Sequence, residues 1–191
     1  MSHLLRRPPT YALVVGVSCF ALGAIAGVVL GSFQDALYAA ARLQIIKRPE
    51  VHGFAGTELI DQARIAEVAD QSNAALRLLH SHTLGIGILI ILTTLVIVNL
   101  PLPARSKTIL CILASLGAAY PLGYAVMALL IPLVGVDALR TPVEMVFFIP
   151  FGAALMISFL GTLGLLLVSW IMGWDKAQIT GNDAVRTSPA E

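Results

Sequence analysis

The sequence predicts an all-α integral membrane protein, a four-helix bundle with one long helical segment outside the membrane between spans one and two. Of its 191 residues, 58% are hydrophobic and only 12% are charged, and the mean hydropathy is +0.87. Four stretches carry no Asp, Glu, Lys or Arg, namely 8–34, 78–104, 108–136 and 145–174. Each exceeds the ~20 apolar residues with which a helix crosses a ~30 Å hydrocarbon core. This composition excludes a nucleic-acid-binding protein, a disordered chain and a secreted disulfide scaffold.

The first span is predicted at about 11–33, and it is retained because no small-residue cleavage signal of a signal peptide follows it. Gly23, Gly27 and Gly31 recur at every fourth position and form a smooth helix face on which another helix can lie closely. Such a face is typical of ordinary helix packing. Because a protein of four helices has few internal partners for it, we predict that a second copy of the chain covers it in a homo-oligomer.

The segment 34–78 is the only part with a soluble composition, and we expect it on the extracytoplasmic side. It is too short to bury a core of its own, so it should cover the membrane part. Thr57 is a candidate N-cap, with Glu58 and Asp61 placed favourably in the first helical turn. No Gly or Pro interrupts the sequence from there to Leu79, which predicts a helix that continues directly into the second span.

Three further spans complete the predicted membrane domain. They cover about 79–100, 108–135 and 143–173. Spans two and three are joined by a short basic turn and must form an antiparallel hairpin. Pro121 and Pro132 lie inside span three, where each removes a backbone hydrogen bond and favours a kink. The domain is thus expected over 1–174, followed by a flexible polar cytoplasmic tail over 175–191.

The distribution of basic residues predicts the orientation. Arg6 and Arg7 precede span one, Arg105 and Lys107 separate spans two and three, and Lys176 follows span four. Basic residues close to the spans favour the cytoplasmic side. We therefore predict a multi-pass protein of the inner (plasma) membrane, embedded in the lipid bilayer, with both termini in the cytoplasm.

His80 and His82 stand at the head of span two, where an ionisable side chain usually faces a bundle interior, a cofactor or a water-filled cavity. Two residues apart on a helix, they point about 200° away from each other. They cannot bind one ion together, so each addresses a different neighbour. The alternative is that both lie at the interface, in water or hydrogen-bonded to carbonyl groups.

Two tyrosines reach a similar depth. At a rise of ~1.5 Å per residue, His80 lies about 31 Å above the cytoplasmic turn and Tyr124 about 25 Å above it. Tyr120 is one turn from Tyr124 on the same face, and Glu144 opens span four at that end. A histidine, two phenols and a carboxylate are thus expected to converge in the outer half of the bundle. Tyrosines at this depth are otherwise ordinary interfacial residues.

The segments 77–81 (Arg-Leu-Leu-His-Ser) and 117–124 (Gly-Ala-Ala-Tyr-Pro-Leu-Gly-Tyr), separated by an apolar span that closes on Leu-Pro and a short basic turn, resemble the styrene oxide isomerase family. The resemblance extends over about 77–173. Members of that family are small four-span membrane enzymes that bind heme b and isomerise epoxides to aldehydes. The resemblance implies that His80 is the axial heme ligand and metal-binding residue, and that Tyr124 is the catalytic tyrosine.

The chain departs from the family at two positions. The family's substrate-contacting Asn falls on Ile86, and His82 is additional, as in the His-X-His of heme-copper oxidase-like proteins whose histidines serve different centres. We count His82 and Tyr120 with His80 as candidate cofactor-binding residues. No second histidine lies in a facing span, so a heme iron held by one histidine would keep an open site. Such a ferric iron is a Lewis acid that can weaken an epoxide C–O bond.

The sequence is compatible with three functions. The first is a heme-b membrane protein related to the epoxide isomerases, which acts on a small hydrophobic substrate. The second is a membrane redox or metal-handling protein in which His80 and His82 serve two centres. The third is a cofactor-free structural or transport subunit. Span four lacks the paired charges of an ion pathway, which argues against a transporter.

Overall fold

The computed structural model describes residues 5–172, which are almost entirely helical and contain no strand. The predicted tail over 175–191 lies outside the described residues. The elements are α1 (Thr10–Ile46), α2 (Pro49–His52), α3 (Glu58–Asn99), α4 (Ala104–Leu116), the 3-10 turn η1 (Gly117–Ala119), α5 (Leu122–Val134), α6 (Val136–Val143), the π-turn η2 (Glu144–Phe148) and α7 (Ile149–Met172).

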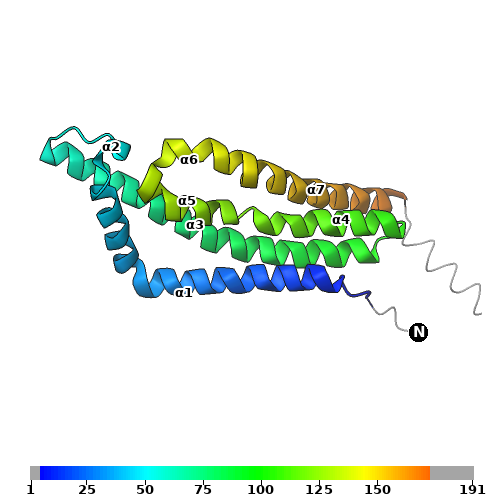
Figure 1. The fold of residues 1–191 in the computed structure, drawn as a ribbon. Coiled ribbons are helices and arrows are strands. Elements are labelled where there is room, and N and C mark those ends of the chain that lie inside the picture. Colours follow the sequence, from blue (N-terminus) through cyan, green and yellow to red (C-terminus); the bar gives the residue numbers. More distant parts are fainter. Residues whose placement is uncertain (1–4, 173–191) are drawn as a thin grey trace, which may run out of the picture.

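Four helical segments are long and apolar enough to cross a membrane: α1, α3, α4 with α5, and α6 with α7. Figure 1 shows them side by side along one long axis, with α1 on one side of α3 and with α4, α5 and α7 on the other. α3 is the central element, since it packs against α1, α4, α5 and α7. The described chain begins and ends at the same end of the bundle (Figure 1), as four antiparallel crossings require. The predicted four-span, all-α membrane fold is confirmed.

The helix of the first span continues beyond the end of the predicted span. At Phe33, where the predicted span ends, the backbone leaves helical geometry (φ −129°, ψ 17°) and α1 bends. The part after the bend reaches Ile46 and places Ile45 in a buried cluster with Ile65 and Val68 of α3 and Ile131 of α5. The segment after the first span therefore shares its buried cluster with α3 and α5 and packs over the end of the bundle opposite the described termini (Figure 1).

The helix predicted to run from the connection into span two is also confirmed. α3 begins at Glu58 and continues without a break to Asn99. Thr57 stands at the N-cap position, but its side chain makes no capping hydrogen bond. Asp61 instead accepts hydrogen bonds from the backbone N–H groups of Ala55 and Gly56, at 2.7 and 3.1 Å. The carboxylate thus fixes the loop that leads into the helix.

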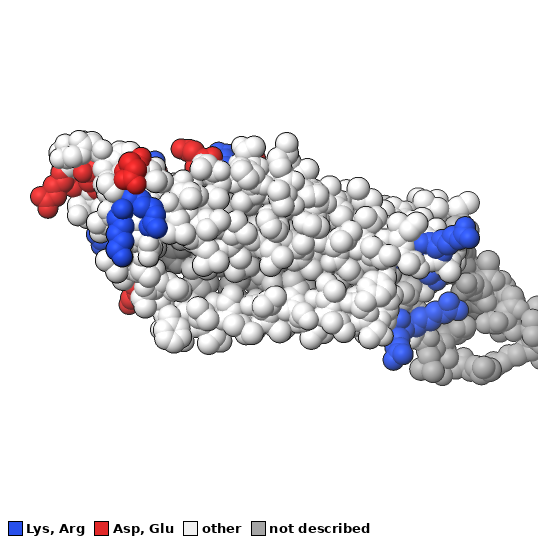
Figure 2. Space-filling model, in the orientation of Figure 1, with Lys and Arg blue, Asp and Glu red and all other residues white. Residues whose placement is uncertain are grey.

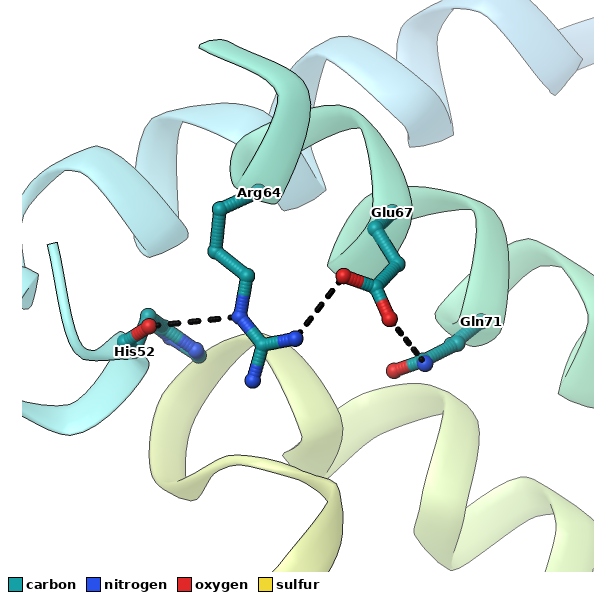
Figure 3. Close-up of polar contacts among 4 residues, drawn as sticks. All are labelled: His52, Arg64, Glu67 and Gln71. Atoms are coloured by element: carbon teal, nitrogen blue, oxygen red, sulfur yellow. Dashed lines mark hydrogen bonds and ion pairs between the residues drawn. The ribbon is translucent and has the colours of Figure 1, made fainter. Parts of the chain in front are cut away.

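Hydrogen bonds hold the short helix α2 against its neighbours (Figure 3). The Arg64 guanidinium donates to the backbone carbonyl of His52 at 3.3 Å and pairs with Glu67 at 2.8 Å, and Gln71 donates to the same carboxylate. The imidazole of His52 is buried, and its Nε2 lies 3.2 Å from the carbonyl oxygen of Pro132 at the end of α5. Because a carbonyl only accepts, this nitrogen is the donor.

The two prolines of span three have different consequences. Pro121 follows the 3-10 turn η1 and stands at the start of α5, so the third span is interrupted there as predicted. Pro132 lies inside α5 and has no N–H to donate to the carbonyl of Ala128, four residues earlier. The buried hydroxyl of Ser72 on α3 donates to that carbonyl at 2.7 Å. A hydrogen bond between helices thus replaces the one that the proline removes.

The glycine face of α1 is covered by α3. A Cβ atom on Gly23 would lie 2.8 Å from Cγ of Leu84, and one on Gly27 would lie 2.5 Å from Cε1 of His80. Both distances are too short for real contacts, so the two backbones approach each other only because these positions are glycine. The prediction that a second copy of the chain covers this face is therefore wrong. Gly31 differs, since nothing lies within 4 Å of its Cβ position.

Candidate functional site

The two histidines of span two lie on opposite sides of α3 and contact different helices. His80 faces α1, where its Nδ1 lies 2.7 Å from the backbone carbonyl oxygen of Gly23. His82 faces α5, and its Nδ1 lies 3.0 Å from the carbonyl oxygen of Leu78, one turn earlier in its own helix. The i, i+2 spacing predicted that each would address a different neighbour, and the structure shows which neighbour each one has.

These hydrogen bonds determine the tautomer of both rings. A carbonyl oxygen can only accept, so each Nδ1 carries the proton, and each Nε2 of the neutral ring keeps its lone pair. Neither Nε2 has a hydrogen-bond partner among residues 5–172, whereas every fully buried side-chain nitrogen or oxygen atom in that range has one. Neither Nε2 atom is therefore fully buried, although that of His80 lies over α1, 3.2 Å from the position of a Cβ on Gly27. Each histidine thus has one free lone pair on Nε2, and the hydrogen bond of Nδ1 fixes the orientation of its ring.

His82 is part of an aromatic cluster. Its ring centroid lies 4.9 Å from that of Tyr124 and 5.8 Å from that of Tyr120. The two phenol oxygens are 3.2 Å apart and share a hydrogen bond. Phe148 closes the cluster with centroid distances of 4.7 Å to Tyr124 and 5.0 Å to Tyr120. Two phenols and one imidazole are thus gathered between α3, α5 and η2.

Two irregular turns build this cluster. Tyr120 directly follows the 3-10 turn η1, which packs against α3, and Phe148 is the last residue of the π-turn η2, which packs against α5. The ring of Phe148 occupies the space that a Cβ on Gly123 would need, so only glycine allows this approach. π-turns within α-helices often occur at functional sites. η2 was not predicted from the sequence; the residue that indicates it is Pro150, since proline cannot donate to the carbonyl four residues earlier.

His80 lies in a different environment, on the α1 side of α3. Its ring occupies the space left by Gly27, and Arg77 stands one turn earlier in α3, exposed and without an ion pair among the described residues. An apolar cavity of about 540 Å³ lies close by between α1, α3 and α5, lined in part by Leu79 and Thr83. This volume falls within the ~300–1,000 Å³ of typical cofactor and ligand pockets. His80 itself does not line it.

The structure brings together only some of the predicted site residues. Tyr120 and Tyr124 meet as expected, but their histidine neighbour is His82, and His80 lies on the other side of α3. Glu144 does not join them, because its carboxylate pairs with Arg140 at 3.2 Å on the exposed surface. Ile86, the position of the family's Asn, is buried in an apolar cluster.

In the part of the chain that the structure describes, no three His, Cys, Asp or Glu side chains lie close enough together to hold a metal ion. Each site therefore offers a single imidazole. Fold and site define an integral membrane protein with two separate histidine positions in the middle of its central helix, α3. No protein family model matches the chain, and neither a curated protein nor a solved structure is similar enough to match.

Proposed function

We propose that this integral membrane protein binds heme b through His80. The observation that carries the proposal is the bond from Nδ1 of His80 to the carbonyl of Gly23, which leaves the Nε2 lone pair without a hydrogen-bond partner among the described residues. Histidines that bind a metal almost always donate their other ring nitrogen to a carbonyl or carboxylate, because that bond fixes the tautomer and the ring orientation. The resemblance of segments 77–81 and 117–124 to a heme-b family supports the same assignment.

The surrounding residues fit such a group in their chemistry. His80 would supply the one protein ligand, and the exposed Arg77 one turn away is a cation suited to a heme carboxylate. The nearby apolar cavity between α1, α3 and α5 is lined by Leu79 and Thr83 but by neither His80 nor Arg77. When bound through one histidine, ferric heme supplies an open coordination site with Lewis-acid character.

Epoxide isomerisation of a small hydrophobic substrate is the activity that the resemblance implies, with Tyr124 as the group that hydrogen-bonds the substrate oxygen. One O–H group of the phenol pair is free to donate, but the pair lies on the α5 side of α3 and His80 on the α1 side, so this activity rests on the resemblance and not on the packing. The position of His82 beside Tyr124 favours a second candidate, a redox or metal-handling protein with one centre on each side of α3. Homo-oligomer formation stays a prediction, now without the glycine face of α1.

The proposal includes an orientation, with both termini in the cytoplasm and the chain in the inner (plasma) membrane. Figure 2 supports it, since basic residues gather at the end where α1 begins, while acidic and basic residues mix at the opposite end. Among the described residues, the basic set comprises Arg6, Arg7, Arg105 and Lys107. Basic residues next to the spans favour the cytoplasmic side.

An absorption spectrum of the detergent-purified protein tests heme binding. The parent protein should show a Soret band. His80→Ala should abolish or strongly diminish it, whereas the matched variant His82→Ala should retain it, since the ~200° between the two side chains turns His82 toward α5. A band that survives His80→Ala and disappears in His82→Ala would reverse the assignment. Absence of a Soret band from the parent protein, both after purification and after addition of hemin, would refute heme binding and favour the cofactor-free subunit.

The isomerase activity needs its own test. An aryl epoxide is incubated with the heme-loaded protein, and aldehyde formation is followed. Tyr124→Phe should keep the Soret band and lower the turnover, because it removes only a hydroxyl group from the phenol pair. Tyr11→Phe, at the other end of the bundle, is the control for loss of a phenol. A heme-containing parent protein without turnover would leave the binding proposal intact and refute the isomerase.

A further inference from the structure

Heme binding at His80 makes no use of the second histidine. His82, Tyr120, Tyr124 and Phe148 form a compact cluster on the opposite side of α3, which we call the His82 cluster. We propose that the His82 cluster binds an aromatic hydroxyl compound, a phenol or quinol with an apolar tail, that enters sideways from the bilayer. This proposal rests on the geometry of the cluster and is independent of the heme.

The hydrogen-bonding groups of the cluster match a hydroxyl group. Nε2 of His82 is an acceptor, because the proton of the ring is on Nδ1 and is donated to Leu78. The two phenols share one hydrogen bond, so one of their two O–H donors remains. One acceptor and one donor are what a single hydroxyl group needs, since it donates through its hydrogen and accepts through its oxygen. An ether or an epoxide would use only the donor.

The aromatic rings of the cluster favour a ligand in which that hydroxyl is attached to an aromatic ring. Phe148 and both tyrosines lie with centroids 4.7–5.8 Å apart, at tilted or edge-to-face angles. These are the distances at which aromatic rings attract each other beyond simple burial of area. At this end of the bundle, an amphipathic ring with one polar tip is also the type of group that prefers the membrane interface.

The same face of α3 provides a route from the bilayer. Gly85, one turn after His82, is exposed, and nothing lies within 4 Å of its Cβ position. Farther along the helix, Leu89 lines an apolar groove of about 190 Å³ between α3 and α7, together with Leu92 and Phe159. In the proposal, the apolar tail lies against this groove, and the ring with its hydroxyl lies at the His82 cluster.

Two probes that differ in one hydrogen-bond donor test the proposal. 4-n-Butylphenol and 4-n-butylanisole are equilibrated with the full-length protein in nanodiscs, and binding is corrected for partition into protein-free nanodiscs. The phenol should bind saturably and about tenfold more tightly than the anisole, because the methyl ether cannot donate to His82. Equal affinity of the two probes would overturn the proposal. Absence of saturable phenol binding would also overturn it and leave water as the partner of the imidazole.

Variants separate the contributions of the cluster. His82→Phe keeps a ring and should remove the preference for the phenol over the anisole, and Tyr124→Phe should weaken phenol binding about three- to tenfold. Gly85→Leu should obstruct the route and weaken both probes, whereas Gly31→Leu, also in open space, should change neither. A phenol preference that survives His82→Phe in a protein with unchanged thermal unfolding would refute the site.

The failure of this proposal is distinguishable from failure of the heme proposal. The Soret band is recorded on the same preparations. Phenol binding without any Soret band would support the His82 cluster and refute heme binding at His80. A Soret band that depends on His80, without phenol selectivity, would support the heme and refute the phenol site.

Discussion

Replacement of Gly27 by Ala tests the contact on which the His80 site depends. A Cβ atom at this position would lie 2.5 Å from Cε1, 2.8 Å from Nδ1 and 3.2 Å from Nε2 of His80. All three atoms belong to a ring that cannot bend, so either the ring must rotate away or the helices must separate. Rotation breaks the 2.7 Å hydrogen bond to the carbonyl of Gly23.

The size of the effect follows from three contributions. Overpacking of a close contact typically destabilises a protein by ~1–3 kcal/mol. Loss of the hydrogen bond to Gly23 adds about 1 kcal/mol. Removal of a helical glycine works in the opposite direction, by roughly 0.5–1 kcal/mol. The expected loss in the free energy of unfolding for Gly27→Ala is therefore about 1–3.5 kcal/mol. The Soret band should fall in parallel, because the proposed heme ligand His80 is displaced.

The chain offers two controls for this measurement. Gly31→Ala is the same substitution one turn later in α1, where nothing lies within 4 Å, so it should be neutral or slightly stabilising. In the His80→Ala background, Gly27→Ala should lose most of its effect, because the group it collides with is gone. Reversible unfolding in SDS mixed micelles, followed by far-UV circular dichroism, gives the free energies. Equal stability of the two glycine variants, or an unchanged penalty in the His80→Ala background, would refute the contact.

Two further predictions concern the bundle. Ser72→Ala should destabilise the protein by about 1–3 kcal/mol because it leaves the buried carbonyl of Ala128 without a donor. Adding Pro132→Ala should recover much of that loss by restoring the backbone N–H, and unfolding of the double variant checks this. Reporter fusions at Glu191 and within 50–56 should report opposite sides of the membrane, the former cytoplasmic. Agreement between the two fusions would contradict the four-span topology.

Local sequence patterns were sufficient to predict the membrane spans and the long central helix α3. A charge-free run of more than twenty residues can be placed in a bilayer only as a helix, because every backbone polar group must be satisfied there. The bend at Phe33 falls where the first such run ends, before Asp35. The helix from Glu58 to Asn99 follows from a stretch of good helix formers joined directly to an apolar span.

Only the tertiary structure could show which helix packs against each face of α3. Sequence spacing fixes the angle between His80 and His82, but it does not fix the rotation of α3 relative to α1 and α5. That rotation places His82 beside Tyr124 and places His80 over Gly27. It depends on how complete helix surfaces fit together, and this fit involves residues far apart in the sequence.

The glycine face of α1 shows the same limit of prediction from sequence. The four-residue period of the glycines in the first span indicated a close helix contact but not the helix that makes it. Packing against α3 buries that face within one chain, because His80 and Leu84 fit over the glycine positions. The sequence thus determined the membrane class, the number of spans and the presence of two opposed histidines. Only the packing of the helices decided which histidine meets the tyrosines and which meets the first span.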